Sequence, residues 1–180
     1  MVALIAVLLG LLRALVALVA LVPSPRAAPA PTPVATPAPT PVSAPSLAEH
    51  EIALVDALNA ERQAAGLEAL TISADLIAVA RTRSRDMMTG GYFAHYAEGH
   101  PSAYELLTDR GMRFTAAGEV LARVASREDS AERAVTALMQ SSTHRDRILD
   151  PLYQLIGVGA ITAQSGQTIY TVLFLTPAGG

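Results

Sequence analysis

Apolar residues recur at the spacing of an α-helix in four segments of the chain. The expected helices span residues 47–65, 74–89, 102–110 and 128–140. On the first helix, the inner face is expected to hold Ile52, Val55, Leu58 and Arg62. On the second, it is expected to hold Leu76, Ala80, Ser84 and Met87. Ser73 precedes the second helix as an N-cap and Gly90-Gly91 ends it, so both of its ends are marked by residues typical of helix caps.

The last third of the chain has a different pattern. Residues 155–161 and 168–175 predict two strands, and the turn residues 164–167 between them predict a hairpin. A further stretch, residues 116–122, is too apolar for an exposed loop and is expected to be a partly buried one. Helices followed by a C-terminal hairpin predict an α+β fold that is built in layers.

The N-terminal part of the chain is expected to lie outside the folded domain. Residues 1–22 form an apolar run long enough for a signal peptide or an N-terminal membrane anchor, although Arg13 interrupts it. Residues 23–45 hold nine of the twelve prolines and are expected to form an extended linker. The folded domain is predicted to span residues 46–177, and the apolar run predicts that this domain is exported.

The composition excludes several kinds of chemistry. A net charge of −3 argues against a nucleic-acid-binding surface, and 4% aromatic residues without tryptophan argue against a stacking platform for bases or sugars. The chain has no cysteine, which excludes disulfides, thiolate metal ligands and a cysteine nucleophile. Histidine and carboxylate side chains are therefore the remaining candidates for a functional site.

Two histidines and one glutamate are the strongest of these candidates. His95 follows the double glycine, Glu119 lies in the apolar stretch, and His144 follows Thr143. Thr143 is expected to cap a short helix that starts at His144, and the positive end of this helix would keep the imidazole neutral, as a metal ligand must be. Neutral imidazoles and carboxylates are typical ligands of divalent metals. A hydrogen-bonded structural cluster is the alternative for the same three residues.

Other polar residues carry weaker predictions. His50 and His100 are expected to be solvated. Three arginines of the second helix are expected on a solvated or ion-paired surface, namely Arg81, Arg83 and Arg85. A serine hydrolase that uses Ser141 or Ser142 is not favoured, because the sequence has neither a nucleophile turn nor an oxyanion hole.

The candidate residues lie in short phrases that resemble a known family. The phrases are Leu58-Asn59-Ala60-Glu61-Arg62, Gly91-Tyr92-Phe93-Ala94-His95, Gly118-Glu119, Ser142-Thr143-His144-Arg145 and Gly157-Val158-Gly159. In order and spacing they are similar to the bacterial SCP-like branch of the CAP superfamily (cysteine-rich secretory proteins, antigen 5 and pathogenesis-related proteins). The resemblance covers about residues 47–176. It implies a three-layer α-β-α sandwich around a small antiparallel sheet.

The resemblance also implies roles for the three candidate residues. His95 matches the first histidine of the family's cleft, Glu119 its first glutamate and His144 its second histidine. Two positions depart from the family's pattern: Val120 stands where asparagine is usual, and Ser141 stands where a second acidic residue is usual. The loss of one carboxylate is expected to weaken the binding of a metal.

The leading hypothesis is an exported, monomeric CAP domain that acts outside the cytoplasm as a binding module. Its cleft would hold a divalent cation weakly, zinc above others, through His95 and His144, with Glu119 bound through water or orienting a histidine. The expected partner is a small molecule, a lipid or a cell-wall component, with no nucleic acid and with membrane contact only through the N-terminal segment. The alternative is a metal-dependent hydrolase of cell-wall or peptide substrates, with Glu119 as metal ligand or general base.

Overall fold

The computed structural model describes residues 48–125 and 128–179. Its elements are α2 (Glu49–Ala64), β1 (Thr71–Ile72), α3 (Ala74–Gly90), α4 (Ala103–Asp109), β2 (Phe114–Val124), α5 (Ser130–Gln140), α6 (Ser142–Ile148), β3 (Leu155–Thr162) and β4 (Thr168–Pro177). The predicted signal peptide or anchor and the predicted linker lie outside the described residues. None of the described helices has the length and apolar character needed to cross a membrane.

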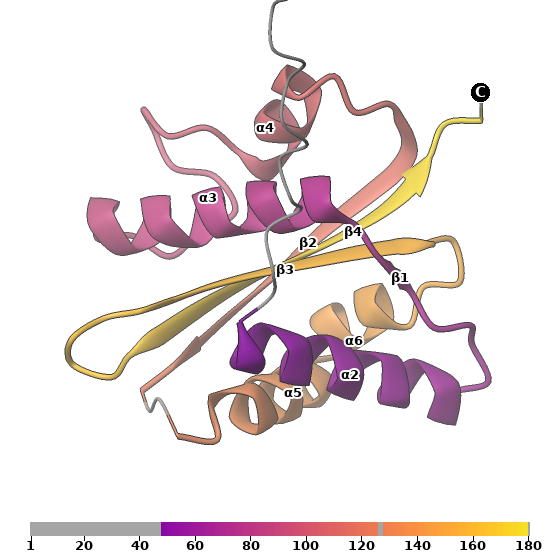
Figure 1. Cartoon of the computed structure of the whole chain (residues 1–180), viewed down its shortest axis with the longest axis horizontal. Helices are drawn as coiled ribbons and strands as arrows, with labels where there is room; N and C mark the ends of the chain where they lie inside the picture. The colour runs from indigo at the N-terminus through magenta and orange to yellow at the C-terminus, as the bar shows by residue number, and fades with distance from the viewer. Residues whose placement is uncertain (1–47, 126–127, 180) are drawn as a thin grey trace, which may run out of the picture. The chain divides into compact units, whose positions relative to one another are not determined.

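The described strands form one sheet in the order β1-β3-β4-β2. β4 is antiparallel to β3, with Val172 opposite Val158, and antiparallel to β2, with Leu173 opposite Glu119. The short β1 runs parallel to β3. Helices α3 and α4 cover one side of this sheet, and α2, α5 and α6 cover the other (Figure 1). The predicted three-layer α+β architecture is therefore confirmed, except that β1 makes the sheet mixed.

Each side of the sheet has its own hydrophobic core. The core beneath α2, α5 and α6 includes Leu54, Leu58, Ala134, Leu138, Ile148, Val158, Val172 and Phe174. The core beneath α3 and α4 includes Leu76, Val79, Ala80, Leu107, Leu173 and Leu175. Successive residues of β4 enter the two cores in turn, as the period of a strand requires. β4 is therefore the central strand on which both helical layers pack.

Most of the predicted helical faces are confirmed. All four residues expected on the inner face of α3 are buried. The Ser73 side chain accepts a hydrogen bond from the Leu76 backbone, and Gly91 ends the helix in the left-handed conformation with φ 69°. Ile52 is an exception, because its side chain is exposed while the neighbouring Glu51 is buried. The inner face of α2 is therefore shifted by one residue from its expected position at this end.

Gly157 and Gly159 allow α3 to lie directly on β3. A Cβ added at Gly157 would lie 2.3 Å from the Cβ of Leu76, and one added at Gly159 would lie 2.1 Å from the backbone nitrogen of Arg81. Both distances are far below van der Waals contact, so a larger residue would push the helix away from the sheet. The phrase Gly157-Val158-Gly159 thus has a structural role in positioning α3.

The prediction of a loop at residues 116–122 is wrong, since these residues form the middle of β2. Every residue from Gly118 to Ala122 is buried, so the strand lacks the alternation of apolar and polar residues that would have revealed it. Its alanines and its glycine also have low strand propensity. Glu119 is consequently held on a paired strand and not on a loop.

Arg62 of α2 fixes the segment that follows α6. Its Nη1 atom donates to the carbonyl oxygens of Ile148 at 2.7 Å and Asp150 at 2.8 Å, and its Nε atom donates to that of Glu68 at 3.0 Å. The carbonyls at the end of a helix have no partner within the helix, and a buried guanidinium satisfies them here. Because α6 carries His144, this anchor also positions the candidate site.

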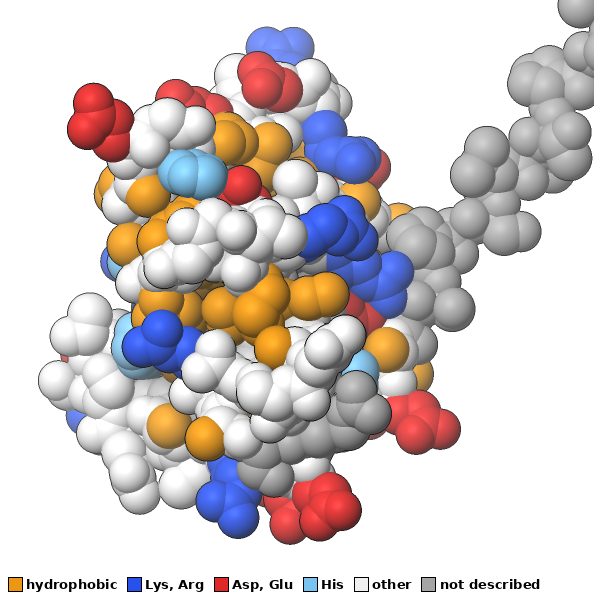
Figure 2. Space-filling view, turned by 90° about the vertical axis from the view of Figure 1, so that its left-hand side faces the viewer, with side chains coloured by type: hydrophobic (Ala, Val, Ile, Leu, Met, Phe, Trp, Pro, Cys, Tyr) orange, Lys and Arg blue, Asp and Glu red, His pale blue; other side chains and the backbone are white. Residues whose placement is uncertain are grey.

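A smaller hydrophobic cluster lies under the loop that follows α3. Its buried members are Met87, Leu121 and Ile169, and Met88, Tyr92, Phe93 and Ile161 pack against them. The Arg123 guanidinium of β2 lies 4.7 Å from the centre of the Phe93 ring, a cation–π contact. Figure 2 shows this end of the domain, where hydrophobic side chains gather in the middle of the face beside basic ones. These contacts hold the loop with His95 against β2.

Candidate functional site: a cleft lined by two histidines

The three candidate residues line one cleft. His95 lies in the loop after α3, Glu119 lies in β2, and His144 lies in α6. The cleft has a volume of about 430 Å³ and is also lined by Tyr96, Ala103, Tyr104, Thr143 and Arg147. The fold therefore brings together side chains from separate segments of the chain.

His95 and Glu119 form a direct hydrogen bond. The Nδ1 atom of His95 lies 2.6 Å from the Oε2 atom of Glu119, and the Glu119 side chain is only 5% exposed. An ionised carboxylate can only accept, so the Nδ1–H group of His95 donates. The pair fixes the orientation of the imidazole and leaves the Nε2 atom of His95 available to the half-open cleft.

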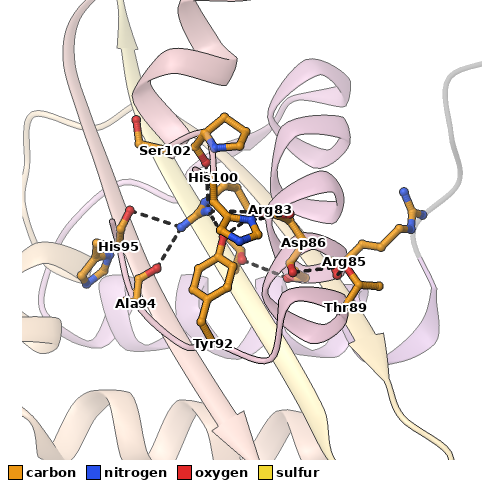
Figure 3. A network of polar contacts seen from close by, with 12 residues as sticks. Arg83, Arg85, Asp86, Thr89, Tyr92, Ala94, His95, His100 and Ser102 are labelled. Atoms are coloured by element: carbon orange, nitrogen blue, oxygen red, sulfur yellow. Dashed lines mark hydrogen bonds and ion pairs between the residues drawn. The ribbon is translucent and has the colours of Figure 1, made fainter. Parts of the chain in front are cut away.

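Arg83 holds both members of this pair from behind. Its Nε atom lies 3.3 Å from the Oε1 atom of Glu119, and its Nη2 atom donates to the carbonyl oxygens of Ala94 at 2.9 Å and His95 at 3.2 Å. Its Nη1 atom donates to the Tyr92 hydroxyl at 2.8 Å and to the carbonyl oxygen of Pro101 at 3.0 Å. Figure 3 shows the guanidinium at the centre of this network.

Arg83 was predicted to lie on a solvated or ion-paired surface; the ion pairing is confirmed, but the surface position is wrong. The side chain is 1% exposed, and its five N–H groups point at the acceptors of the loop and of Glu119. The sequence did contain a signal, because Leu76, Ala80, Arg83 and Met87 follow the i, i+4, i+7 and i+11 spacing of one helix face. An arginine in this stripe needs buried acceptors, and the loop supplies them.

A second histidine–carboxylate pair lies outside the cleft. The Nδ1 atom of His100 lies 3.0 Å from the Oδ1 atom of Asp86, and the Tyr92 hydroxyl donates to the Oδ2 atom of Asp86. Burial alone would raise the pKa of Asp86, but these two bonds and the charges of His100 and Arg83 hold the pKa below its usual value. His100 is therefore partnered, contrary to the expectation that it is solvated.

His144 is the third residue of α6, and the prediction for this helix needs correction. The helix begins at Ser142, with Ser141 at the N-cap position and no capping bond from its side chain, so Thr143 is not the cap. The pKa of His144 is lowered by burial, then by the charges of His95 and Arg147. A neutral imidazole is thus favoured for reasons other than the helix terminus on which the expectation rested.

Arg147 is a lining residue that the sequence did not reveal. It lies three positions after His144 and so on the same face of α6. A Cβ added at Gly118 would lie 3.2 Å from the Cδ atom of Arg147 and 2.5 Å from the Tyr153 hydroxyl oxygen. Gly118 is therefore the position of β2 that lets Arg147 cross the strand beside Glu119. The sequence signal that could have identified Arg147 is its position three residues after His144 in the same helix.

The side chains present offer two donors to a divalent metal. Within the part of the chain that the structure describes, no group of three or more histidine and acidic side chains is arranged to hold a metal ion. Both oxygens of Glu119 are engaged, one by His95 and one by Arg83. The imidazoles of His95 and His144 are therefore the candidate ligands whose rings line the cleft, and Glu119 is placed to orient His95.

A family model described as the cysteine-rich secretory protein family, CAP, matches residues 55–174. The chain belongs to this family, although it contains no cysteine of its own. The resemblance inferred from the short phrases around His95, Glu119 and His144 is thereby confirmed.

The chain is 35% identical over 130 residues to the uncharacterized protein YkwD of Bacillus subtilis. This match covers 72% of the chain but 48% of YkwD, so the chain spans about half the length of this relative. An outer surface protein of Borrelia burgdorferi superposes with a TM-score of 0.65 at 20% identity, over 72% of this chain and 94% of that one. An extracellular SCP-domain protein of Bacillus anthracis gives a TM-score of 0.63 at 24% identity, over 71% and 40%.

Proposed function

We propose that this protein is an extracytoplasmic binding module that acts as a monomer, with the cleft between His95 and His144 as its ligand site. The observation that carries the proposal is the buried Glu119 carboxylate, which lies between His95 and Arg83. It orients the His95 imidazole so that one edge of the ring faces the cleft. The N-terminal apolar run supports export, as do the structural neighbours described as an outer surface protein and an extracellular protein. The ligand is a small molecule, a lipid or a cell-wall component.

The same cleft is proposed to hold a divalent cation weakly. Zinc is proposed because imidazole nitrogens are among its usual ligands in proteins. His95 and His144 would supply the donors, and Glu119 would act as the carboxylate that orients His95. Affinity is expected to be modest, because two protein donors are fewer than the three or four of strong zinc sites and because Arg147 lies nearby.

The contacts of Glu119 favour binding over metal-dependent hydrolysis. A general base needs a carboxylate oxygen that faces the reacting water. Here one oxygen accepts from His95 at 2.6 Å and the other faces Arg83 at 3.3 Å. The hydrolase hypothesis is therefore not the one proposed.

Calorimetric titration with zinc tests the cation site. The wild type should release or absorb heat at one site, and His144→Ala should lose most of it. His50→Ala is the matched control, because the His50 ring packs against Tyr170 away from the cleft and the variant removes one histidine in the same way. Binding should weaken as the pH falls, since protonated imidazole cannot bind a metal. Equal zinc affinity in all three proteins would contradict the proposal.

A further inference from the structure

Arg147 brings a positive charge into the cleft. It lines the cleft together with His95, Glu119 and His144. In the described part of the chain, no acidic side chain lies within ion-pair distance of its guanidinium. Its neighbour Arg145 on the same helix contrasts with it, because Arg145 lies 3.9 Å from Asp146 and does not line the cleft.

The charges around the cleft do not cancel Arg147. Glu119 is the acidic residue that lines the cleft, and the buried guanidinium of Arg83 already lies beside it. With the glutamate compensated and no metal bound, Arg147 is the arginine of the described cleft lining that has no acidic partner. A ligand with a single negative charge would balance it.

We infer that the ligand of this cleft carries a carboxylate group, which Arg147 binds. The inference rests on the proposed binding role of the cleft and names the chemical class of its ligand. A guanidinium and a carboxylate match in geometry and can form two parallel hydrogen bonds. In the metal-free cleft a carboxylate is favoured over a phosphate monoester, because the described lining has no second arginine to pair with a second negative charge.

The rest of the cleft has room for a ligand that is larger than a carboxylate group. Its volume of about 430 Å³ far exceeds that of one carboxylate group, and its wall includes Ala103 and the rings of Tyr96 and Tyr104. The Tyr104 hydroxyl donates to the Ala117 carbonyl oxygen at 2.8 Å, so the ring is held in place at the wall. The C-terminal end of a peptide and a short fatty acid both carry a carboxylate attached to a larger group of this kind.

Calorimetry on the full-length chain tests this with two acids and their neutral amides. Octanoate and N-acetyl-alanine are titrated beside octanamide and N-acetyl-alaninamide. At least one acid should bind, and its amide should not. Arg147→Gln should weaken acid binding by about tenfold or more, since charge-assisted hydrogen bonds are lost. Arg145→Gln removes the same charge from the same helix and should leave acid affinity within about twofold, because Arg145 does not line the cleft.

The outcomes separate the ligand class from the proposed function. Binding of octanoate alone identifies a lipid source, and binding of N-acetyl-alanine alone identifies a peptide source; both support the inference. Equal affinity for acid and amide, equal loss in the two arginine variants, or preference for inorganic phosphate would overturn it. Zinc is titrated into the same samples. Zinc binding without acid binding sinks this inference alone, whereas a protein that binds neither fails the proposed function as well.

Discussion

Two histidine–carboxylate pairs lie on either side of Arg83, and they differ in what surrounds the carboxylate. Glu119 is on a strand, is 5% exposed, and bonds to His95 at 2.6 Å. Asp86 is on a helix, is 26% exposed, and bonds to His100 at 3.0 Å. Arg83 lies 3.3 Å from the first carboxylate and 3.9 Å from the second. Only the first pair opens onto the cleft.

The difference shows how one type of residue pair serves two purposes. The Asp86 pair braces the loop, because Tyr92 donates to the same carboxylate and its ring lies 4.5 Å from that of His100. The Glu119 pair sits where β2 meets the cleft, so its histidine is held from behind and remains accessible in front. The shared Arg83 couples the two pairs, and its removal should therefore have the largest effect.

Replacement of Arg83 by methionine should destabilise the domain by about 3–5 kcal/mol. The change leaves Glu119 as a buried charge without its cation and leaves the carbonyls of the His95 loop without a donor. Urea unfolding followed by circular dichroism measures the effect. Arg85→Met is the control, because Arg85 is exposed on the same helix and should change the free energy of unfolding by less than about 0.5 kcal/mol. Similar losses in both variants would mean that the network does not stabilise the fold.

Replacing each of the two carboxylates by its amide should lower the stability of the domain by different amounts. Glu119→Gln should cost about 2 kcal/mol, because the Arg83 charge remains buried and loses an ionic partner. Asp86→Asn should cost less than about 1 kcal/mol, because this carboxylate is partly exposed and its ion pairs are screened by water. The same urea experiment compares the two variants. A larger loss of unfolding free energy in Asp86→Asn than in Glu119→Gln would contradict the prediction that Glu119 is the main ionic partner of the buried Arg83.

Sequence patterns predicted the parts of this fold that rest on local periodicity. The helices, the C-terminal hairpin and the glycines under α3 follow from spacing and backbone sterics, and the phrases around His95 and His144 identified the family. The face of α3 was correct at Leu76, Ala80 and Met87, because a helix buried on one side keeps its apolar stripe. These features depend on residues close together in the chain.

Features that depend on tertiary contacts were not predictable in the same way. β2 is buried on both faces by layers that come from elsewhere in the chain, so its pattern has no alternation to recognise. Arg83 and His100 are polar residues whose partners are a loop carbonyl group and a distant carboxylate. The apolar stripe of α3 marks Arg83 as facing inward, unlike the exposed Arg85, but it does not identify the partners of Arg83, and no such stripe marks His100.

The smallest expected effect concerns the cleft and its dependence on pH. Because the pKa of His144 in the folded protein is lowered, the unfolded chain binds a proton at a higher pH than the folded domain does. The folded state is therefore fully favoured above the usual histidine pKa of 6.5, and this contribution is lost as the pH falls through the lowered value. His144→Gln should flatten the dependence of the unfolding free energy on pH below 6.5 without changing it at pH 8. Urea midpoints at pH 8, 6.5 and 5.5 measure this, with His50→Gln as the control that removes a histidine outside the cleft. An unchanged slope in His144→Gln would show that the cleft does not suppress protonation of His144.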